Sequence, residues 1–199
     1  MKRIKIAKAL MASGLICITL SVALLCYNTY ENRKAQQFSD AIMEVLRIMV
    51  ENEKLQNQSP DPFDDAMTEK EIDGYMYVGY LSIPALEIDL PVMSTWDRTR
   101  LRIAPCRYYG STKTDNLVIA AHNYRYHFGY LGHLKKGDLV IFSDMDGVDH
   151  TYKVKRVDQV LPTDVDKVKD TGFELTLYTC TYGGARRIVA RCEKVKTKS

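Results

Sequence analysis

Beyond residue 75 the sequence consists of short apolar segments, rich in β-branched and aromatic residues, that alternate with turn-forming residues. The connecting stretches are rich in Pro, Gly, Asp and Ser, which favour turns over regular structure. Many short strands with such connections are typical of closed β-barrels and β-sandwiches, so we expect a mainly β domain. The segments that we expect to be strands are 77–83, 88–93, 117–121, 139–142, 151–160, 175–179 and 187–195.

The N-terminal segment differs sharply from this pattern. Four cations, Lys2, Arg3, Lys5 and Lys8, precede an uncharged stretch over residues 9–28. A helix of that length spans the roughly 30 Å of hydrocarbon in a bilayer. The preceding positive charges favour a cytoplasmic N-terminus and an external C-terminal domain. We therefore expect a single-pass membrane anchor, with a cleaved signal peptide as the alternative.

The anchor accounts for most of the positive charge of the chain. The 199 residues contain 28 Lys and Arg against 25 Asp and Glu. Without the four N-terminal cations, 24 basic residues remain against 25 acidic ones, so the rest of the chain is near neutral. A domain with balanced charge has no electrostatic reason to bind nucleic acid.

The segment between the anchor and the strands has a helical pattern. Phe38, Ile42, Val45 and Met49 recur at steps of three and four residues, among polar residues, within the segment 29–58. We expect an amphipathic juxtamembrane helix that packs its apolar side on the domain; a self-associating stalk is the alternative. The predicted organisation is a basic cytoplasmic segment 1–8, a transmembrane anchor 9–28, a juxtamembrane helix and loop 29–74, and a β domain 75–199.

Three residues of chemical interest lie at the ends of expected strands. Cys180 and His122 each end an apolar run, and Arg187 begins the last strand. A rigid sheet can hold a thiol nucleophile, a proton-transfer group and a positive charge for an oxyanion within reach of one another. Arg186 is the alternative to Arg187 for the cationic role.

The motifs around these residues resemble those of sortases, which are cysteine transpeptidases. The segment 176–180, Thr-Leu-Tyr-Thr-Cys, is similar to the sortase signature Thr-Leu-x-Thr-Cys, and the segment around His122 is similar to the sortase histidine region. The strand that begins at Arg187 is similar to the sortase arginine strand. The resemblance covers roughly residues 77–195 and implies an eight-stranded sortase-type β-barrel.

The resemblance also implies roles for individual residues. Cys180 would attack the substrate carbonyl, and Arg187 would stabilise the oxyanion that forms. His122 would protonate the leaving amine and later accept a proton from the incoming amine. The backbone N–H of Thr181 would be a second oxyanion donor, and Thr179 would help to position the substrate. The resemblance implies neither a metal nor an organic cofactor.

Partners and location follow from the same resemblance. The substrate would be the sorting-signal peptide of a surface protein or a pilin. The acceptor would be an amine of a peptidoglycan precursor or a pilin lysine. The enzyme would be anchored in the cell membrane of a Gram-positive bacterium, with its catalytic domain outside. Two other interpretations are a hydrolytic cysteine peptidase, in which water resolves the thioester, and a non-catalytic surface-binding module on the same barrel.

One loop carries a further resemblance. Asp61-Pro62-Phe63 is similar to the Asp-Pro-aromatic lid of pilin-polymerising sortases, so Asp61 and Phe63 are candidates for a lid over residues 59–65. The alternative is an ordinary connection between the helix and the β domain. The subclass stays open between class B-like and pilin-type class C-like enzymes.

The remaining cysteines and histidines of the domain suggest no second reactive site. Cys106 and Cys192 either form a disulfide or are small buried hydrophobic residues. His127, His133 and His150 lie in polar or loop sequences, and we expect them to be solvated. The histidines lack the compact spacing of zinc motifs, so no metal site is predicted.

Overall fold

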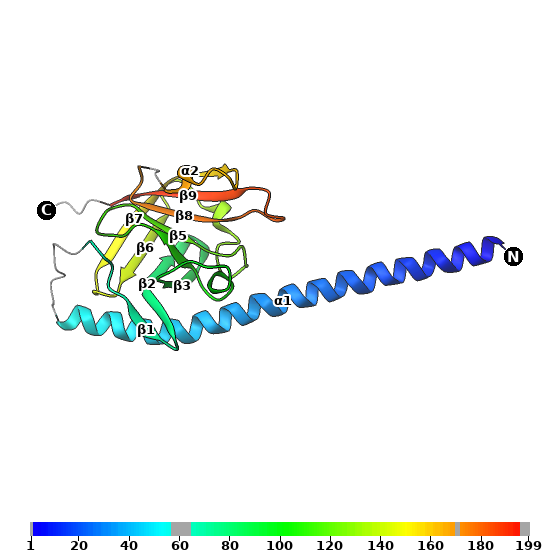
Figure 1. The fold of residues 1–199 in the computed structure, drawn as a ribbon, viewed down its shortest axis with the longest axis horizontal. Coiled ribbons are helices and arrows are strands. Elements are labelled where there is room, and N and C mark those ends of the chain that lie inside the picture. The colour runs from blue at the N-terminus through cyan, green and yellow to red at the C-terminus, as the bar shows by residue number, and fades with distance from the viewer. Residues whose placement is uncertain (1, 57–64, 170–171, 196–199) are drawn as a thin grey trace. The chain divides into compact units, whose positions relative to one another are not determined.

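The chain forms two compact units, Met1–Lys34 and Ala35–Ser199. The computed structural model describes residues 2–56, 65–169 and 172–195 (Figure 1). The first unit belongs to helix α1 (Lys2–Gln56), which is long and apolar enough to cross a membrane. The expected anchor and the expected amphipathic helix are therefore parts of one continuous helix. Continuous i to i−4 hydrogen bonds pair the backbone N–H and C=O groups through the junction between the two parts.

The second unit is built around a closed barrel of eight strands, which confirms the fold expected from the sequence. Neighbouring strands follow the order β1-β2-β3-β4-β5-β8-β9-β7-β6, and β6 pairs with β2 to close the ring. β1 lies outside the ring as an extra strand on β2. The strands are β1 (Lys70–Ile72), β2 (Tyr75–Ile83), β3 (Ile88–Met93), β4 (Cys106–Tyr109), β5 (Leu117–Ala120), β6 (Leu139–Asp144), β7 (Asp149–Val160), β8 (Leu175–Cys180) and β9 (Arg187–Lys194).

The barrel interior is filled by the alternating apolar residues of its strands. One core cluster takes buried side chains from β2, β3 and β5 to β9. Leu81, Ile119, Phe142 and Leu177 are among its fully buried members. Because strand side chains alternate between faces, this inward set fixes which residues of each strand face outward.

Two strands were not expected from the sequence, although all seven expected segments are strands. β1 has three residues, too few to show an alternating pattern. β4 reads Cys-Arg-Tyr-Tyr, and only Cys106 of the four is fully buried. β4 is a strand because it pairs with its neighbours, through one residue pair with β3 and three residue pairs with β5. Tertiary pairing, not local preference, makes these two segments strands.

The part of α1 that belongs to the second unit packs against the outside of the barrel. Ile42, Leu46 and Val50 are buried in a cluster with Tyr77 of β2 and Met93 of β3. Val45, which the sequence pattern placed on this face, is 41% exposed. The buried residues Ile42, Leu46 and Val50 recur every four residues and so lie on one side of the helix. The helix therefore packs its apolar side on the domain, as expected.

The C-terminal turns of α1 are also tied to the barrel by polar contacts. Lys54 Nζ lies 2.9 Å from Asp149 at the start of β7, and Lys70 of β1 pairs with Glu53 at 3.3 Å. The turn between β6 and β7 approaches the same helix closely. A Cβ at Gly147 would lie 2.8 Å from the backbone N of Lys54, and its φ of +78° is left-handed. Glycine satisfies both requirements at this turn.

Replacing Leu46 with Ala should destabilise the second unit by about 2–5 kcal/mol, because Leu46 is fully buried between helix and barrel. Ile48→Ala is the matched control on the same helix, since Ile48 is 58% exposed and should cost under about 1 kcal/mol. Thermal unfolding of the full chain in detergent measures both. Equal losses of stability would mean that the helix does not pack on the barrel through its Leu46 face.

Candidate active site

The parallel pairing of β5 with β8 brings His122 and Cys180 to one end of the barrel. Ala120 is the register partner of Tyr178, and the N–H of Ala121 donates to the carbonyl of Tyr178 at 3.1 Å. His122 lies two residues after the end of β5, and Cys180 is the last residue of β8. Both residues therefore lie at the same end of two adjacent strands, and neighbouring strands in a sheet are about 4.8 Å apart.

The antiparallel pairing of β8 with β9 places Arg187 opposite Cys180. The two are direct register partners at the turn-proximal end of the hairpin, which is seen in Figure 1. Paired Cα atoms of antiparallel strands are about 4.5–5.5 Å apart. His122, Cys180 and Arg187 thus come from three successive strands at one end of the barrel. The Cys180 thiol is half-buried and free.

Thr179 joins the two parallel strands just before the candidate site. Its side chain is buried, and its hydroxyl donates to the carbonyl of Ala121 at 2.8 Å. This hydrogen bond holds the end of β8 against the residue that precedes His122. The expected role of Thr179 in positioning the substrate stays a prediction.

The turn between β8 and β9 engages the expected second oxyanion donor. The N–H of Thr181 donates to the carbonyl of Arg186 at 2.9 Å, and the N–H of Gly184 donates to the carbonyl of Thr181 at 2.8 Å. Gly183 and Gly184 have φ values of +79° and +74°, which only glycine adopts readily. The Thr181 N–H can meet an oxyanion only if its bond to Arg186 opens.

The two consecutive arginines of this turn point into different hollows. Arg187 lines a cavity beside Tyr178, and its Nη1 donates to the carbonyls of Gly184 at 3.2 Å and Arg186 at 3.4 Å. Arg186 lines a separate hollow on the side of β7. The strand register pairs Arg187, not Arg186, with Cys180.

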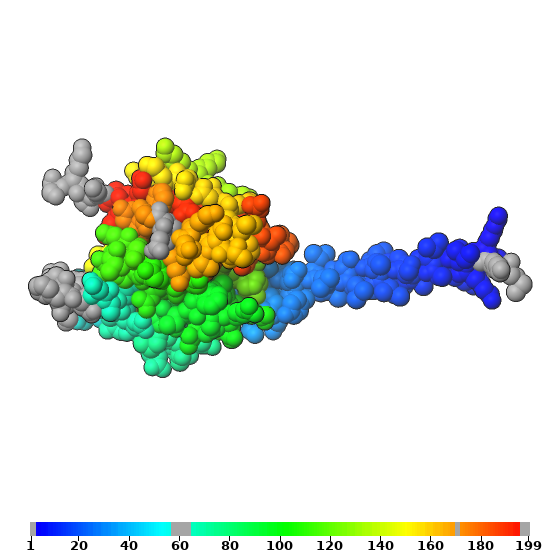
Figure 2. All heavy atoms as spheres, turned by 45° about the horizontal axis from the view of Figure 1, so that its top comes forward, coloured from blue at the N-terminus to red at the C-terminus, as the bar shows by residue number. Residues whose placement is uncertain are grey.

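The cavity beside Arg187 has a volume of about 170 Å³ and a lining of aromatic and aliphatic side chains together with the charged Asp164 and Arg187. Trp96, Tyr108 and Tyr178 form one wall, with ring centroids 5.6 Å and 5.3 Å apart in successive edge-on contacts. The segment 161–168, after β7, forms the opposite wall. Figure 2 shows this orange segment against the green surface of the residues near β4. A concave space with aromatic walls and a few charged groups is typical of a ligand-binding site.

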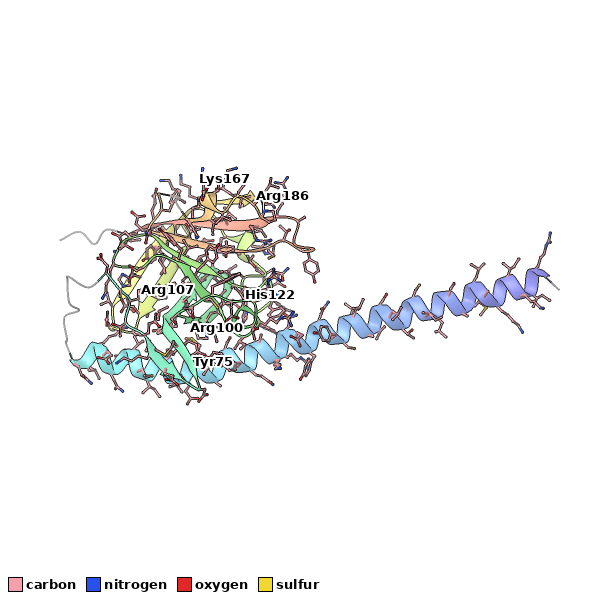
Figure 3. All side chains as sticks on the ribbon, viewed as in Figure 1. Tyr75, Arg100, Arg107, His122, Lys167 and Arg186 are labelled. Atoms are coloured by element: carbon pink, nitrogen blue, oxygen red, sulfur yellow. The ribbon has the colours of Figure 1, made fainter. Side chains whose placement is uncertain are left out.

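Two residues near His122 were not identified from the sequence. The ring of Tyr124 stacks on the His122 ring, with centroids 4.0 Å apart and planes 16° from parallel. Figure 3 shows where His122 lies on the barrel. The ring of His127 lies 5.6 Å from that of Tyr124. Both follow His122 in an irregular loop, where no periodic pattern marks a residue as packed.

The expectation that His127 and His150 are solvated was wrong. His127 is 1% exposed, and no described residue forms a hydrogen bond with either of its ring nitrogens. Burial lowers the pKa of His127 to about 3, so its ring stays neutral. His150 lies 2.7 Å from the Asp144 carboxylate. His133 is exposed, as expected.

The two other domain cysteines are buried and unpaired, which resolves the alternatives left by the sequence. Cys192 lies in the barrel core, and Cys106 lies in the cluster under α1. Burial raises the pKa of each thiol to about 12, so both stay protonated at neutral pH. Their inertness leaves Cys180 as the candidate nucleophile of the domain.

Two further expectations from the sequence concern a lid over the site and a metal site. The candidate lid residues Asp61 and Phe63 lie outside the described residues. Among residues 2–56, 65–169 and 172–195, no three His, Cys, Asp or Glu side chains are grouped as a metal site requires.

Comparisons with known proteins identify the family. The family model described as Sortase domain matches residues 81–195, more than half of the chain. This chain belongs to the sortase family. It is 31% identical over 137 residues to Sortase A of Streptococcus agalactiae serotype III (strain NEM316), which covers 60% of this chain and 53% of that protein. The chain therefore matches about half the length of that curated relative.

Solved sortases of two classes share the fold. Sortase C1 of Streptococcus agalactiae has a TM-score of 0.56 at 22% identity, covering 85% of this chain and 98% of that one. Sortase A of Corynebacterium diphtheriae also has a TM-score of 0.56, at 19% identity, covering 86% of this chain and 95% of that one. Equal similarity to both classes establishes the barrel and leaves the subclass open.

Thiol labelling should separate the three domain cysteines. At pH 8, iodoacetamide should modify Cys180 of the folded protein and leave Cys106 and Cys192 untouched, because the buried thiols remain protonated and covered. After unfolding in guanidinium chloride all three should react. Tryptic mass spectrometry reads each site. Labelling of Cys180 as slow as that of the buried pair would contradict the geometry described above.

Proposed function

We propose that this sortase is a membrane-anchored cysteine transpeptidase whose catalytic residues are Cys180, His122 and Arg187. The observation that carries the proposal is the strand order. Cys180 pairs directly with Arg187 across β8 and β9, and β8 is the parallel neighbour of the strand that leads into His122. Cys180, His122 and Arg187 come from neighbouring strands at one end of the barrel, and Arg187 lines a cavity with aromatic walls, which supports a joint role for the three residues.

The chemistry proceeds in two halves. The Cys180 thiolate attacks the carbonyl carbon of the scissile peptide bond, and the Arg187 guanidinium stabilises the oxyanion. The carbon–nitrogen bond then breaks, His122 gives its proton to the leaving amine, and a thioester remains on Cys180. An incoming amine attacks the thioester and loses a proton to His122. The sulfur leaves, and a new amide bond forms.

The cavity lined by Trp96, Tyr108 and Tyr178 is the proposed binding site for the acyl side of a sorting signal. It is lined by Arg187, the register partner of Cys180, so a peptide bound there would lie close to the proposed nucleophile. The acceptor is an amine of a peptidoglycan precursor. A pilin lysine is the second candidate, because solved neighbours include a Streptococcus pneumoniae sortase C described as having pilin substrate specificity.

The proposed location is the outer face of a Gram-positive cell membrane. α1 supplies a helix able to span the bilayer, and the cations at its start favour retention of the N-terminus in the cytoplasm. Protease added to cells stripped of their wall should digest the C-terminal domain. Full protection of that domain would contradict the proposed orientation.

The direct test is a panel of fluorogenic sorting-signal peptides, supplied with triglycine or with a lysine-containing peptide as the amine. The full chain in detergent should cleave one member and join its acyl fragment to the amine, and mass spectrometry should detect that product. Cleavage without transfer would favour the hydrolytic peptidase. Cys180→Ala should abolish both reactions, whereas Cys106→Ala should retain them. Cleavage by the Cys180→Ala protein would overturn the proposal.

Arg187→Ala should lower kcat/KM by about 100-fold or more, because it removes the proposed oxyanion stabiliser. Arg187→Lys should recover only part of the rate, since a point charge does not reproduce the planar guanidinium. Arg186→Ala should be milder, because Arg186 lines the other hollow. Steady-state kinetics with the cleaved peptide measures all three. A larger loss for Arg186→Ala than for Arg187→Ala would reassign the cationic role.

Tyr124→Ala should lower kcat/KM by about threefold to tenfold, the scale of one aromatic stacking contact, because the His122 ring loses the surface against which it is oriented. Tyr124→Phe keeps the stacking face and should retain the rate. Tyr130→Ala is the control from the same loop, since Tyr130 stacks on the exposed His133. Equal rates for the Ala and Phe variants at Tyr124 would show that stacking does not position His122.

A further inference from the structure

A second hollow lies beside the peptide cavity and shares a wall with it. Leu161 and Asp164 line both spaces, and the second hollow has a volume of about 500 Å³. Its other walls come from β7, β9 and the short helix α2 (Asp166–Lys169). Arg186 faces this space, whereas its neighbour Arg187 faces the peptide cavity.

The lining of the second hollow has an excess of positive charge. Four cationic side chains surround it against two carboxylates, which leaves two positive charges uncompensated. Gln159 adds a neutral hydrogen-bonding group. The cations are Arg156, Lys167, Arg186 and Arg191, and the carboxylates are Asp158 and Asp164.

Most of these charged side chains form ion pairs with one another, and the pairs show which cation is left to bind a ligand. Asp158 accepts from both Arg156, at 3.0 Å, and Arg191, at 2.7 Å. Lys167 pairs with Asp164 at 2.9 Å. In the described part of the chain, the Arg186 guanidinium has no hydrogen bond or ion pair. Figure 3 shows Arg186 and Lys167 on the same side of the barrel.

The position of the hollow indicates whether the acyl donor or the amine acceptor can reach it. β9 separates β8 from β7, and Arg187 of β9 pairs with Val160 of β7. The hollow is thus on the opposite side of Cys180 from His122. In the proposed mechanism His122 meets both the leaving and the incoming amine. A group in the hollow therefore belongs to the acyl donor, the part of the sorting signal retained as the thioester.

We propose that the Arg186 hollow binds a carboxylate-bearing side chain of the donor peptide, upstream of the scissile bond. The inference rests on the proposed function and assigns a substrate preference to the same site. A free guanidinium offers paired donors that match the two oxygens of a carboxylate. Donor peptides with Glu or Asp at that point are therefore preferred to isosteric peptides with Gln or Asn.

A binding measurement tests the hollow without catalysis. Saturation-transfer NMR with the full chain in an uncharged detergent should detect acetyl-Glu-Glu-Glu-amide and give a much weaker signal for acetyl-Gln-Gln-Gln-amide. Arg186→Gln should remove most of this difference. Lys136→Gln, which removes an exposed cation elsewhere on the barrel, should retain it. Equal signals for the two peptides with the unaltered protein would overturn the proposal.

Kinetics tests the same preference during turnover. Two copies of the cleaved donor peptide, differing only by Glu or Gln upstream of the bound segment, should differ in kcat/KM by about threefold to fivefold. Salt should weaken the preference. Arg186→Gln should abolish it and Arg156→Gln should reduce it, whereas Lys136→Gln should preserve it. A ratio near one, or a ratio unchanged by Arg186→Gln, would overturn the proposal.

The two measurements separate this inference from the proposed function. If no peptide in the panel is cleaved, the function fails, and the NMR comparison still decides whether the hollow binds carboxylates. If a peptide is cleaved and transferred while Glu and Gln peptides bind alike, the hollow proposal fails and the transpeptidase assignment is unaffected.

Discussion

The parallel pairing of β5 with β8 determines where every group of the proposed site lies. It runs through four register pairs from Leu117↔Leu175 to Ala120↔Tyr178, and the Thr179 hydroxyl extends it to Ala121. A shift of one residue would exchange the inward and outward faces of a strand. Because Leu117 and Ile119 must face the core, that shift is disfavoured. Core packing therefore fixes the end of β5, and with it the start of the His122 loop.

The β8–β9 turn adds the second constraint. Its carbonyl groups at Arg186 and Gly184 hold the Arg187 guanidinium, and the Arg186 carbonyl also holds the Thr181 N–H. One short turn therefore engages both the Arg187 guanidinium and the Thr181 N–H, the two oxyanion donors that the family resemblance implies. If the Thr181 N–H served an oxyanion, it would first have to leave the Arg186 carbonyl, whereas only Nη1 of the Arg187 guanidinium is engaged by the turn. The turn also divides the two arginines between neighbouring hollows.

The sequence predicted most of the barrel because alternation of apolar and polar residues records which face of a strand is buried. It also placed Cys180, His122 and Arg187 where apolar runs end or begin, and the strand pairing brings these positions to one end of the barrel, while their catalytic roles stay a prediction. It missed β4, whose residues become a strand through their neighbours β3 and β5. It also misjudged His127, which tertiary packing encloses beside Tyr124. The bond between Thr181 and Arg186 depends on turn geometry, which residue spacing does not encode.

The central claim is that Cys180 forms the thioester at the edge where β5, β8 and β9 meet. Intact-protein mass spectrometry tests it most directly, on the full chain mixed with the cleaved peptide and quenched in acid within seconds. We expect a mass increase equal to the acyl fragment, located on Cys180 by peptide mapping and lost when an amine is added before quenching. An acyl group on any other residue would contradict it, as would turnover of the peptide without a covalent intermediate.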